Sequence, residues 1–255
     1  MVINNNFKTG LILFFIGMLG VASLVPLIPQ LLASKADSLP FSMEVMILIG
    51  VAQSSVMLIL MIWLGMVFSK KVGLTVPVIS ALVHSENALE WLKPQIKPAV
   101  IGGVLAGVII LVFSSSLIGY LPEEFIKAGE NFVIPWYARI FYGGITEELL
   151  IRWGLMSFFV WGLYRLTQKK DSEIRDYNYI VAIILAALAF GILHLPVAYA
   201  LTSNVTPLLI AYIVIGNSAF GFIGGYLFWK YGLECAIGAH MMTHVTMMVG
   251  LSFVG

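Results

Sequence analysis

Charged residues are scarce in this chain, and their scarcity decides its class. Of its 255 residues, 11% are charged and 60% are hydrophobic, whereas soluble domains carry about 25% charged residues. The mean hydropathy is +0.98. This composition leaves no room for a soluble domain, so we interpret residues 1–255 as a single integral membrane domain.

A strong net charge, a pair of cysteines and the catalytic and phosphate-binding loop motifs of common soluble enzymes are also missing. The formal net charge is +1, which lacks the basic excess of a nucleic-acid-binding protein, so no nucleic-acid partner is expected. The single Cys235 excludes a disulfide framework and a cysteine-based zinc knuckle. There is no Gly-x-Ser-x-Gly elbow and no phosphate-binding loop.

Long apolar runs are present instead, and a run of about 20 residues can cross a bilayer as a helix. We predict spans over residues 11–32, 45–68, 98–118, 132–166, 179–201, 207–229 and 233–254. The first run is too long for the core of a signal peptide, so we expect an uncleaved anchor. The predicted fold is all-α, a polytopic transmembrane helical bundle in a lipid bilayer.

The run 132–166 is too long for one straight crossing. About 35 residues of helix would reach about 52 Å, against a hydrocarbon core of about 30 Å. Gly143 and Gly144 mark a natural break just before two glutamates. One crossing here gives seven spans and a broken helix gives eight, so we predict seven to eight spans with a long or broken helix carrying the Glu-Glu motif.

Basic loops mark the cytoplasmic side of a membrane protein. With a cytoplasmic N-terminus and seven spans, the lysine pairs at 70–71 and 169–170 and the single Lys230 all fall on the cytoplasmic side. The acidic pair at 123–124 then falls on the other side. We therefore predict a multi-pass protein whose N-terminus is cytoplasmic.

Three charged residues follow the two glycines: Glu147, Glu148 and Arg152. Each charge costs about 2.5–3.5 kcal/mol at the centre of a spanning helix, so such residues are usually paired, turned inward and functional. Glu148 and Arg152 are i,i+4 neighbours in the favourable order for an ion pair. Glu147 lies about 100° further round the helix and lacks such a partner. A structural ion cluster is the alternative interpretation.

Three of the four histidines fall within predicted spans. Phe190 and His194 are spaced i,i+4, and so are His240 and His244, a spacing at which two imidazoles can hold one metal ion or one water. A lone histidine in a membrane usually bonds a neighbouring helix. Three imidazoles and a free carboxylate on three segments favour activation of water instead, with the carboxylate as base. The reaction would be hydrolysis of a carbonyl, most simply of a peptide bond.

Together these motifs resemble those of the CPBP family of intramembrane proteases. That family includes the CAAX prenyl endopeptidases and bacterial proteins linked to bacteriocin processing and immunity. The resemblance lies within residues 132–255 and rests on Glu147-Glu148-x-x-x-Arg152, Phe190-x-x-x-His194 and His240-x-x-x-His244. It implies an endopeptidase of a prokaryotic cell membrane that cleaves a membrane-anchored peptide or protein, including lipidated ones.

The resemblance also implies a role for each matching residue. Glu147 would be the general base, His194 would help to hold the water, and His240 would serve the same centre or stabilise the oxyanion. The supporting residues would be Glu148, Arg152 and Phe190.

The final position of the last motif departs from the family, which usually has an amide or an acid there. Here it is His244, whose imidazole can be a donor or a metal ligand. We predict a glutamic-type peptidase without a cofactor. If a metal such as zinc is bound, its ligands would be Glu147, His194, His240 and His244.

Two alternatives without proteolysis remain open. Ionisable residues inside spans also mark ion- or proton-coupled transporters, although no inverted repeat or pair of broken helices accompanies them here. The other alternative is a non-catalytic membrane scaffold or immunity protein on the same fold, which the histidine at position 244 would favour.

Overall fold

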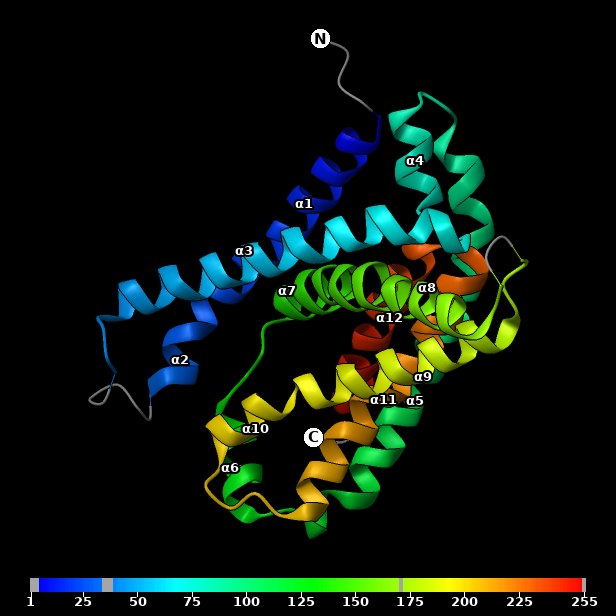
Figure 1. The fold of residues 1–255 in the computed structure, drawn as a ribbon. Helices are drawn as coiled ribbons and strands as arrows, with labels where there is room; N and C mark the ends of the chain where they lie inside the picture. The colour runs from blue at the N-terminus through cyan, green and yellow to red at the C-terminus, as the bar shows by residue number, and fades with distance from the viewer. Residues whose placement is uncertain (1–4, 34–38, 170–171, 254–255) are drawn as a thin grey trace.

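The structure is a computed structural model that describes residues 5–33, 39–169 and 172–253 (Figure 1). The described residues form helices and contain no strand, which confirms the all-α prediction. The α-helices are α1 (Asn5–Leu24), α2 (Ile28–Leu32), α3 (Met43–Phe68), α4 (Pro77–Val83), α5 (Ala88–Leu117), α6 (Glu123–Asn131), α7 (Trp136–Ala138), α8 (Ser157–Thr167), α9 (Asp176–Leu193), α10 (Leu195–Leu201), α11 (Pro207–Tyr231) and α12 (Leu233–Leu251). Two π-helical segments, η5 (Arg139–Thr146) and η6 (Leu149–Met156), join α7 to α8.

Five helical segments are long and apolar enough to cross a membrane. They cover residues 5–32, 43–72, 88–120, 176–201 and 207–231, and each overlaps one predicted span. Residues 136–167 and α12 are also helical, but they are not among these five by length and composition. The predicted count of seven to eight spans is therefore not confirmed. Lys170 and the first four residues, which belong to the predicted orientation, lie outside the described residues.

The segment 136–167 is one continuous helix, so of the two predicted forms, a long helix or a broken one, the structure has the long one. Its winding changes from α to π and back, but no loop interrupts it. The glycines serve close packing against α12 instead. A Cβ atom on Gly143 would lie 2.5 Å from His244 Nε2, and one on Gly144 would lie 2.5 Å from Met241 Cγ. Contacts this short leave no room for a side chain.

The helices of the bundle enclose segment 136–167 on several sides (Figure 1). In the view, α3 runs alongside this segment. Helices α1 and α12 contact η5, while α3, α9 and α11 contact η6. Because the Glu-Glu motif lies between η5 and η6, its side chains are directed into a bundle interior that neighbouring helices close.

One end of the bundle, which we call the lysine end, is where α1, α5, α9 and α12 begin and α3, α8 and α11 finish. Hydrogen bonds join these termini. The Tyr179 hydroxyl of α9 donates to the Val72 carbonyl at 2.6 Å, and Lys70 donates to Asn6 at the start of α1. The termini of helices far apart in the sequence therefore meet in one layer.

The opposite end, which we call the acidic end, contains α6, α10 and the beginning of α11. The Thr202 hydroxyl donates to Glu124 Oε2 at 2.7 Å, which ties α6 to the end of α10. This bond and those from Ser203 lower the pKa of the Glu124 carboxyl, because they stabilise its ionised form. Both helices thereby form a cap at this end of the bundle.

The contact between α1 and η5 is so close that a glycine substitution can test it. The Thr146 hydroxyl donates to the Gly17 carbonyl at 2.7 Å, and a Cβ on Gly20 would lie 2.1 Å from Thr146 Oγ1. We expect Gly20→Ala to lower the free energy of unfolding by about 1–3 kcal/mol through overpacking. Gly162→Ala is the control, since nothing lies within 4 Å of its Cβ. Melting curves in detergent compare the two, and an unchanged Gly20→Ala protein would contradict this packing.

Candidate active site

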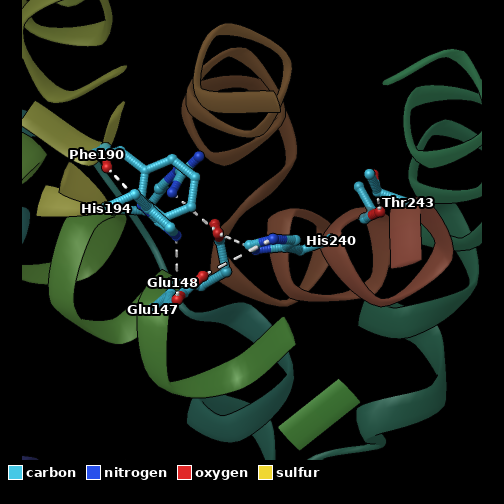
Figure 2. A network of polar contacts seen from close by, with 8 residues as sticks. Glu147, Glu148, Phe190, His194, His240 and Thr243 are labelled. Atoms are coloured by element: carbon cyan, nitrogen blue, oxygen red, sulfur yellow. Dashed lines mark hydrogen bonds and ion pairs between the residues drawn. The ribbon is translucent and has the colours of Figure 1, made fainter. Parts of the chain in front are cut away.

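Glu148 is a buried charge with two partners in the bundle interior. It is completely buried, and its Oε1 lies 3.0 Å from Arg152 Nη1 and 2.8 Å from His240 Nδ1 (Figure 2). The predicted Glu148–Arg152 pair is thus present. The bond from His240 is a second interaction that the sequence did not predict, because it depends on how α12 packs against segment 136–167.

Arg152 is held by aromatic rings as well as by Glu148. It is 1% exposed, and its guanidinium carbon lies 4.9 Å from the ring centroid of Phe190 and 5.0 Å from that of Phe220. Cations over aromatic faces are attracted by the ring quadrupole, more strongly where water is excluded. Phe190 therefore packs beside the cluster, as predicted for a supporting residue, and Phe220 does the same from α11.

Glu147 carries the free carboxylate. Its Oε1 lies 3.7 Å from His194 Nε2, and its Oε2 lies 4.0 Å from His240 Nε2. Both distances are too long for a hydrogen bond, and the carboxylate accepts none from the part of the chain that the structure describes. Figure 2 shows Glu147 and Glu148 on adjacent positions of one helix, with His194 and His240 approaching from two others. Glu147 is thus surrounded by polar groups without being tied to any of them.

The hydrogen bonds of the two histidines identify the protonated nitrogen in each ring. His240 Nδ1 faces the Glu148 carboxylate, and His194 Nδ1 lies 2.8 Å from the Phe190 carbonyl. A carbonyl and an ionised carboxylate only accept, so both Nδ1 atoms donate. In the neutral rings each Nε2 then keeps a lone pair directed at Glu147. One carboxylate and two imidazole lone pairs therefore face a common space, where a water can donate one proton to the carboxylate and the other to one of the two imidazoles.

His244 adjoins this centre through His240. The two rings stack with centroids 4.9 Å apart and an interplanar angle of 16°. Both ring nitrogens of His244 are buried, and neither has a hydrogen-bond partner within the described ranges. The structure thus gathers Glu147, His194 and His240, and it places His244 one helical turn further along α12.

Two neighbours of the centre were missed by the sequence analysis. Phe220 stacks on His240 with centroids 4.0 Å apart, and nothing in the sequence distinguishes it from other aromatic residues of α11. The second is a cavity of about 160 Å³ between α3 and η5, lined by Gln53, Ser54, Met57, Tyr142, Thr146 and Leu150. The polar Gln53-Ser54-Ser55 interruption of an apolar run was a signal that could have found it.

A metal at this centre would need several of the same side chains. One glutamate and two histidines are donor types that catalytic zinc uses. Across residues 5–33, 39–169 and 172–253, however, no group of three or more His, Cys, Asp or Glu side chains is arranged to hold a metal ion. The observed geometry does not fit a metal site, so we derive no step through a metal.

Comparison with known proteins identifies a family for part of the chain. Residues 129–246 match a family described as Rce1-like, type II CAAX prenyl endopeptidase Rce1-like. The matched range contains all three motifs, so the resemblance inferred from the sequence is confirmed. No curated protein and no solved structure matches the chain.

Proposed function

Residues 129–246 of this chain belong to the Rce1-like family of CAAX prenyl endopeptidases, and from this premise we propose that the protein hydrolyses a peptide bond of a membrane-associated or lipidated substrate. The family supports a CAAX-type intramembrane endopeptidase in general terms, and the apolar helices agree with a site inside a bilayer. The observation that carries the finer proposal is the Glu147 carboxylate, which faces two imidazole lone pairs and accepts no hydrogen bond from the described residues.

In the proposed reaction, a water lies between Glu147 and the Nε2 atoms of His194 and His240. Glu147 accepts one proton as the water oxygen forms a bond to the substrate carbonyl carbon. The resulting oxyanion receives a hydrogen bond from the N–H of the neutral His244 ring, whose nitrogens have no hydrogen-bond partner among the described residues. When the carbon–nitrogen bond breaks, the proton held by Glu147 passes to the leaving amine. The products are one carboxyl and one amino terminus, and Glu147 is regenerated.

Glu148 and Arg152 contribute by positioning in this proposal. Glu148 accepts from His240 Nδ1, which fixes the ring orientation and keeps the Nε2 lone pair directed at Glu147. Arg152 neutralises the buried Glu148. A carboxylate, an imidazole and a third orienting group form the same kind of chain in other hydrolases.

The experiment that tests the proposal uses the purified full chain in lipid vesicles with a membrane-anchored reporter peptide. We expect cleavage at a defined bond, with the two fragments together heavier than the reporter by one water. Uptake of protons or ions without cleavage would instead support the transporter alternative. Neither activity across a panel of anchored peptides would support the scaffold alternative.

The choice between glutamic and metal-dependent catalysis has its own test. Because the base in our proposal is a carboxylate, we expect cleavage of the reporter to persist after incubation with a chelator. The measurement is the cleavage rate before and after chelation, with zinc then added back. Loss of activity on chelation and recovery with zinc would contradict the metal-free mechanism.

A further inference from the structure

A cavity lies beside the candidate active site, on the side of segment 136–167 that packs against α3 (Figure 1). Its volume is about 160 Å³, and it is lined by Gln53, Ser54, Met57, Tyr142, Thr146 and Leu150. The first three belong to α3, and the last three belong to η5 and η6. None of the six takes part in the reaction proposed above, so the cavity needs an explanation of its own.

The cavity adjoins the Glu147 carboxylate. Of the residues that line it, Thr146 directly precedes Glu147 and Leu150 is the third residue after it. Tyr142 lies one π turn before Glu147, because the Glu147 amide donates to the Tyr142 carbonyl. The Tyr142 side chain is also within electrostatic reach of the Glu147 carboxylate. One wall of the cavity is therefore made by the same stretch of helix that carries the proposed base.

Three polar side chains that line the cavity lack partners. The Thr146 hydroxyl is already satisfied, because it donates to the Gly17 carbonyl at 2.7 Å. The Gln53 amide and the hydroxyls of Ser54 and Tyr142, by contrast, have no hydrogen-bond partner within the described parts of the chain. An amide and two hydroxyls offer both donors and acceptors. The cavity can therefore bind a ligand that carries donors and acceptors of its own.

The position of Gln53 makes this lack of partners costly. Gln53 lies 10 residues after the start of α3 at Met43 and 15 residues before its end at Phe68. Since residues 43–72 are long and apolar enough to cross a membrane, this amide is near the middle of a span. An unpaired polar group is expensive in hydrocarbon, and polar residues at such depths usually have a function. A bound ligand would supply the missing partner.

The size of the cavity limits what can enter it. A cavity of about 150 Å³ holds one benzene molecule, so the space here is suited to one side chain of the size of leucine or phenylalanine. Pockets for larger ligands measure about 300–1,000 Å³, so the anchor of a lipidated substrate is longer than this cavity can enclose. The backbone of a single peptide residue carries one N–H and one C=O. These groups match the unpaired amide and hydroxyls.

We propose that this cavity is the substrate subsite for the residue next to the scissile bond. Met57 and Leu150 enclose the side chain of that substrate residue. The Gln53 amide and the hydroxyls of Ser54 and Tyr142 bond its backbone. The three α3 residues are then specificity-determining, although α3 lies outside the range that matches the family. The identity of the ligand as a substrate rests on the proposed function.

Filling the cavity should change which peptides are cleaved. Ser54→Leu places a larger side chain in the cavity, so we expect kcat/KM to fall about 10-fold or more for anchored reporters with leucine or phenylalanine beside the scissile bond. Reporters with glycine there should keep their kcat/KM within about twofold, since they leave the cavity empty. Equal losses for both kinds of reporter would overturn the inference.

Ala52→Leu is the matched control for this change. Ala52 is exposed on the same helix and does not line the cavity, so this variant should cleave both kinds of reporter as the wild-type protein does. Met57→Ala covers the case in which Ser54→Leu does not accumulate. It enlarges the cavity, so the ratio of kcat/KM for a tryptophan reporter to that for a leucine reporter should rise about 10-fold. An unchanged ratio would contradict the proposed subsite.

Disulfide trapping separates this inference from the proposed function, because it requires binding but no turnover. The full chain with Ser54→Cys is mixed in lipid vesicles with anchored peptides that carry one cysteine at successive positions, under a mild oxidant. The unmodified chain gives the background, since its single cysteine, Cys235, is buried. We expect strong crosslinking from one peptide position, with the bond that the wild-type protein cleaves directly beside it.

Each combined result of trapping and cleavage decides between the two proposals. Cleavage together with trapping beside the cleaved bond supports the inference. Cleavage without trapping, or with trapping only at distant positions, overturns the inference and leaves the protease intact. Trapping at one position without cleavage of any peptide counts against the proposed function, while it supports the cavity as a peptide-binding site. A chain that neither traps nor cleaves any of the peptides contradicts both proposals.

Discussion

Glu147→Gln is expected to lower the rate of peptide cleavage by about 10²–10⁴-fold, the usual contribution of a general base, without changing the melting temperature. The amide has nearly the shape of the carboxylate, and no described hydrogen bond to that carboxylate is lost, since its contacts with His194 and His240 are 3.7 and 4.0 Å. An amide cannot accept the proton from water. The measurement is single-turnover cleavage of an anchored reporter in vesicles, paired with a melting curve.

Glu148→Gln is the matched control for that experiment. It changes the adjacent carboxylate by the same atoms, but this carboxylate pairs with Arg152 at 3.0 Å and accepts from His240 at 2.8 Å. Its replacement leaves Arg152 uncompensated, so lost activity should be accompanied by a lower melting temperature. Full cleavage by Glu147→Gln would refute the proposed mechanism. Equal losses of activity and stability in both variants would instead favour a purely structural ion cluster.

The helical fold could be predicted because a bilayer imposes simple rules on sequence. Apolar runs of sufficient length located all five segments that are suited to crossing a membrane. For residues 136–167 the same length rule left a long helix and a broken helix open, and it did not decide between them. The rule treats a glycine pair as a weakness in the helix, whereas Gly143 and Gly144 are needed for the close approach of α12. That approach is a tertiary contact, and a single segment does not reveal it.

The candidate site was predictable in its components but not in its connections. Spacing along one helix predicted the Glu148–Arg152 pair, which is local and follows from helix geometry. The bond from His240 to Glu148 joins residues 92 positions apart in the sequence, and it depends on the register between α12 and segment 136–167. The contact of Phe220 with His240 could not be predicted either, because it also depends on how the helices pack. Residues with reactive side chains can be identified from a sequence, but their partners can be assigned only when the packing of the helices is known.

Arg152→Ala is expected to lower the free energy of unfolding by about 3–5 kcal/mol, the cost of leaving a buried partner charge unpaired. Arg152 is 1% exposed and Glu148 is 0% exposed, so water cannot replace the lost guanidinium. The variant also leaves a gap between the rings of Phe190 and Phe220, which flank the guanidinium. We expect a lower melting temperature in detergent, with the fall in activity following the loss of folded protein.

Lys127→Ala provides the matched control, because Glu123 and Lys127 form the same kind of i,i+4 pair on α6 with both side chains largely exposed. Exposed ion pairs contribute little to stability, so this variant should melt at the same temperature as the wild-type protein. The double variant Glu148→Gln with Arg152→Ala removes both buried charges of this pair and should be less destabilised than Arg152→Ala alone, since residue 148 is then no longer an unpaired carboxylate. An Arg152→Ala variant as stable as Lys127→Ala would show that the buried pair does not hold these helices together. A double variant whose loss of stability exceeds the summed losses of the two single variants would show the same.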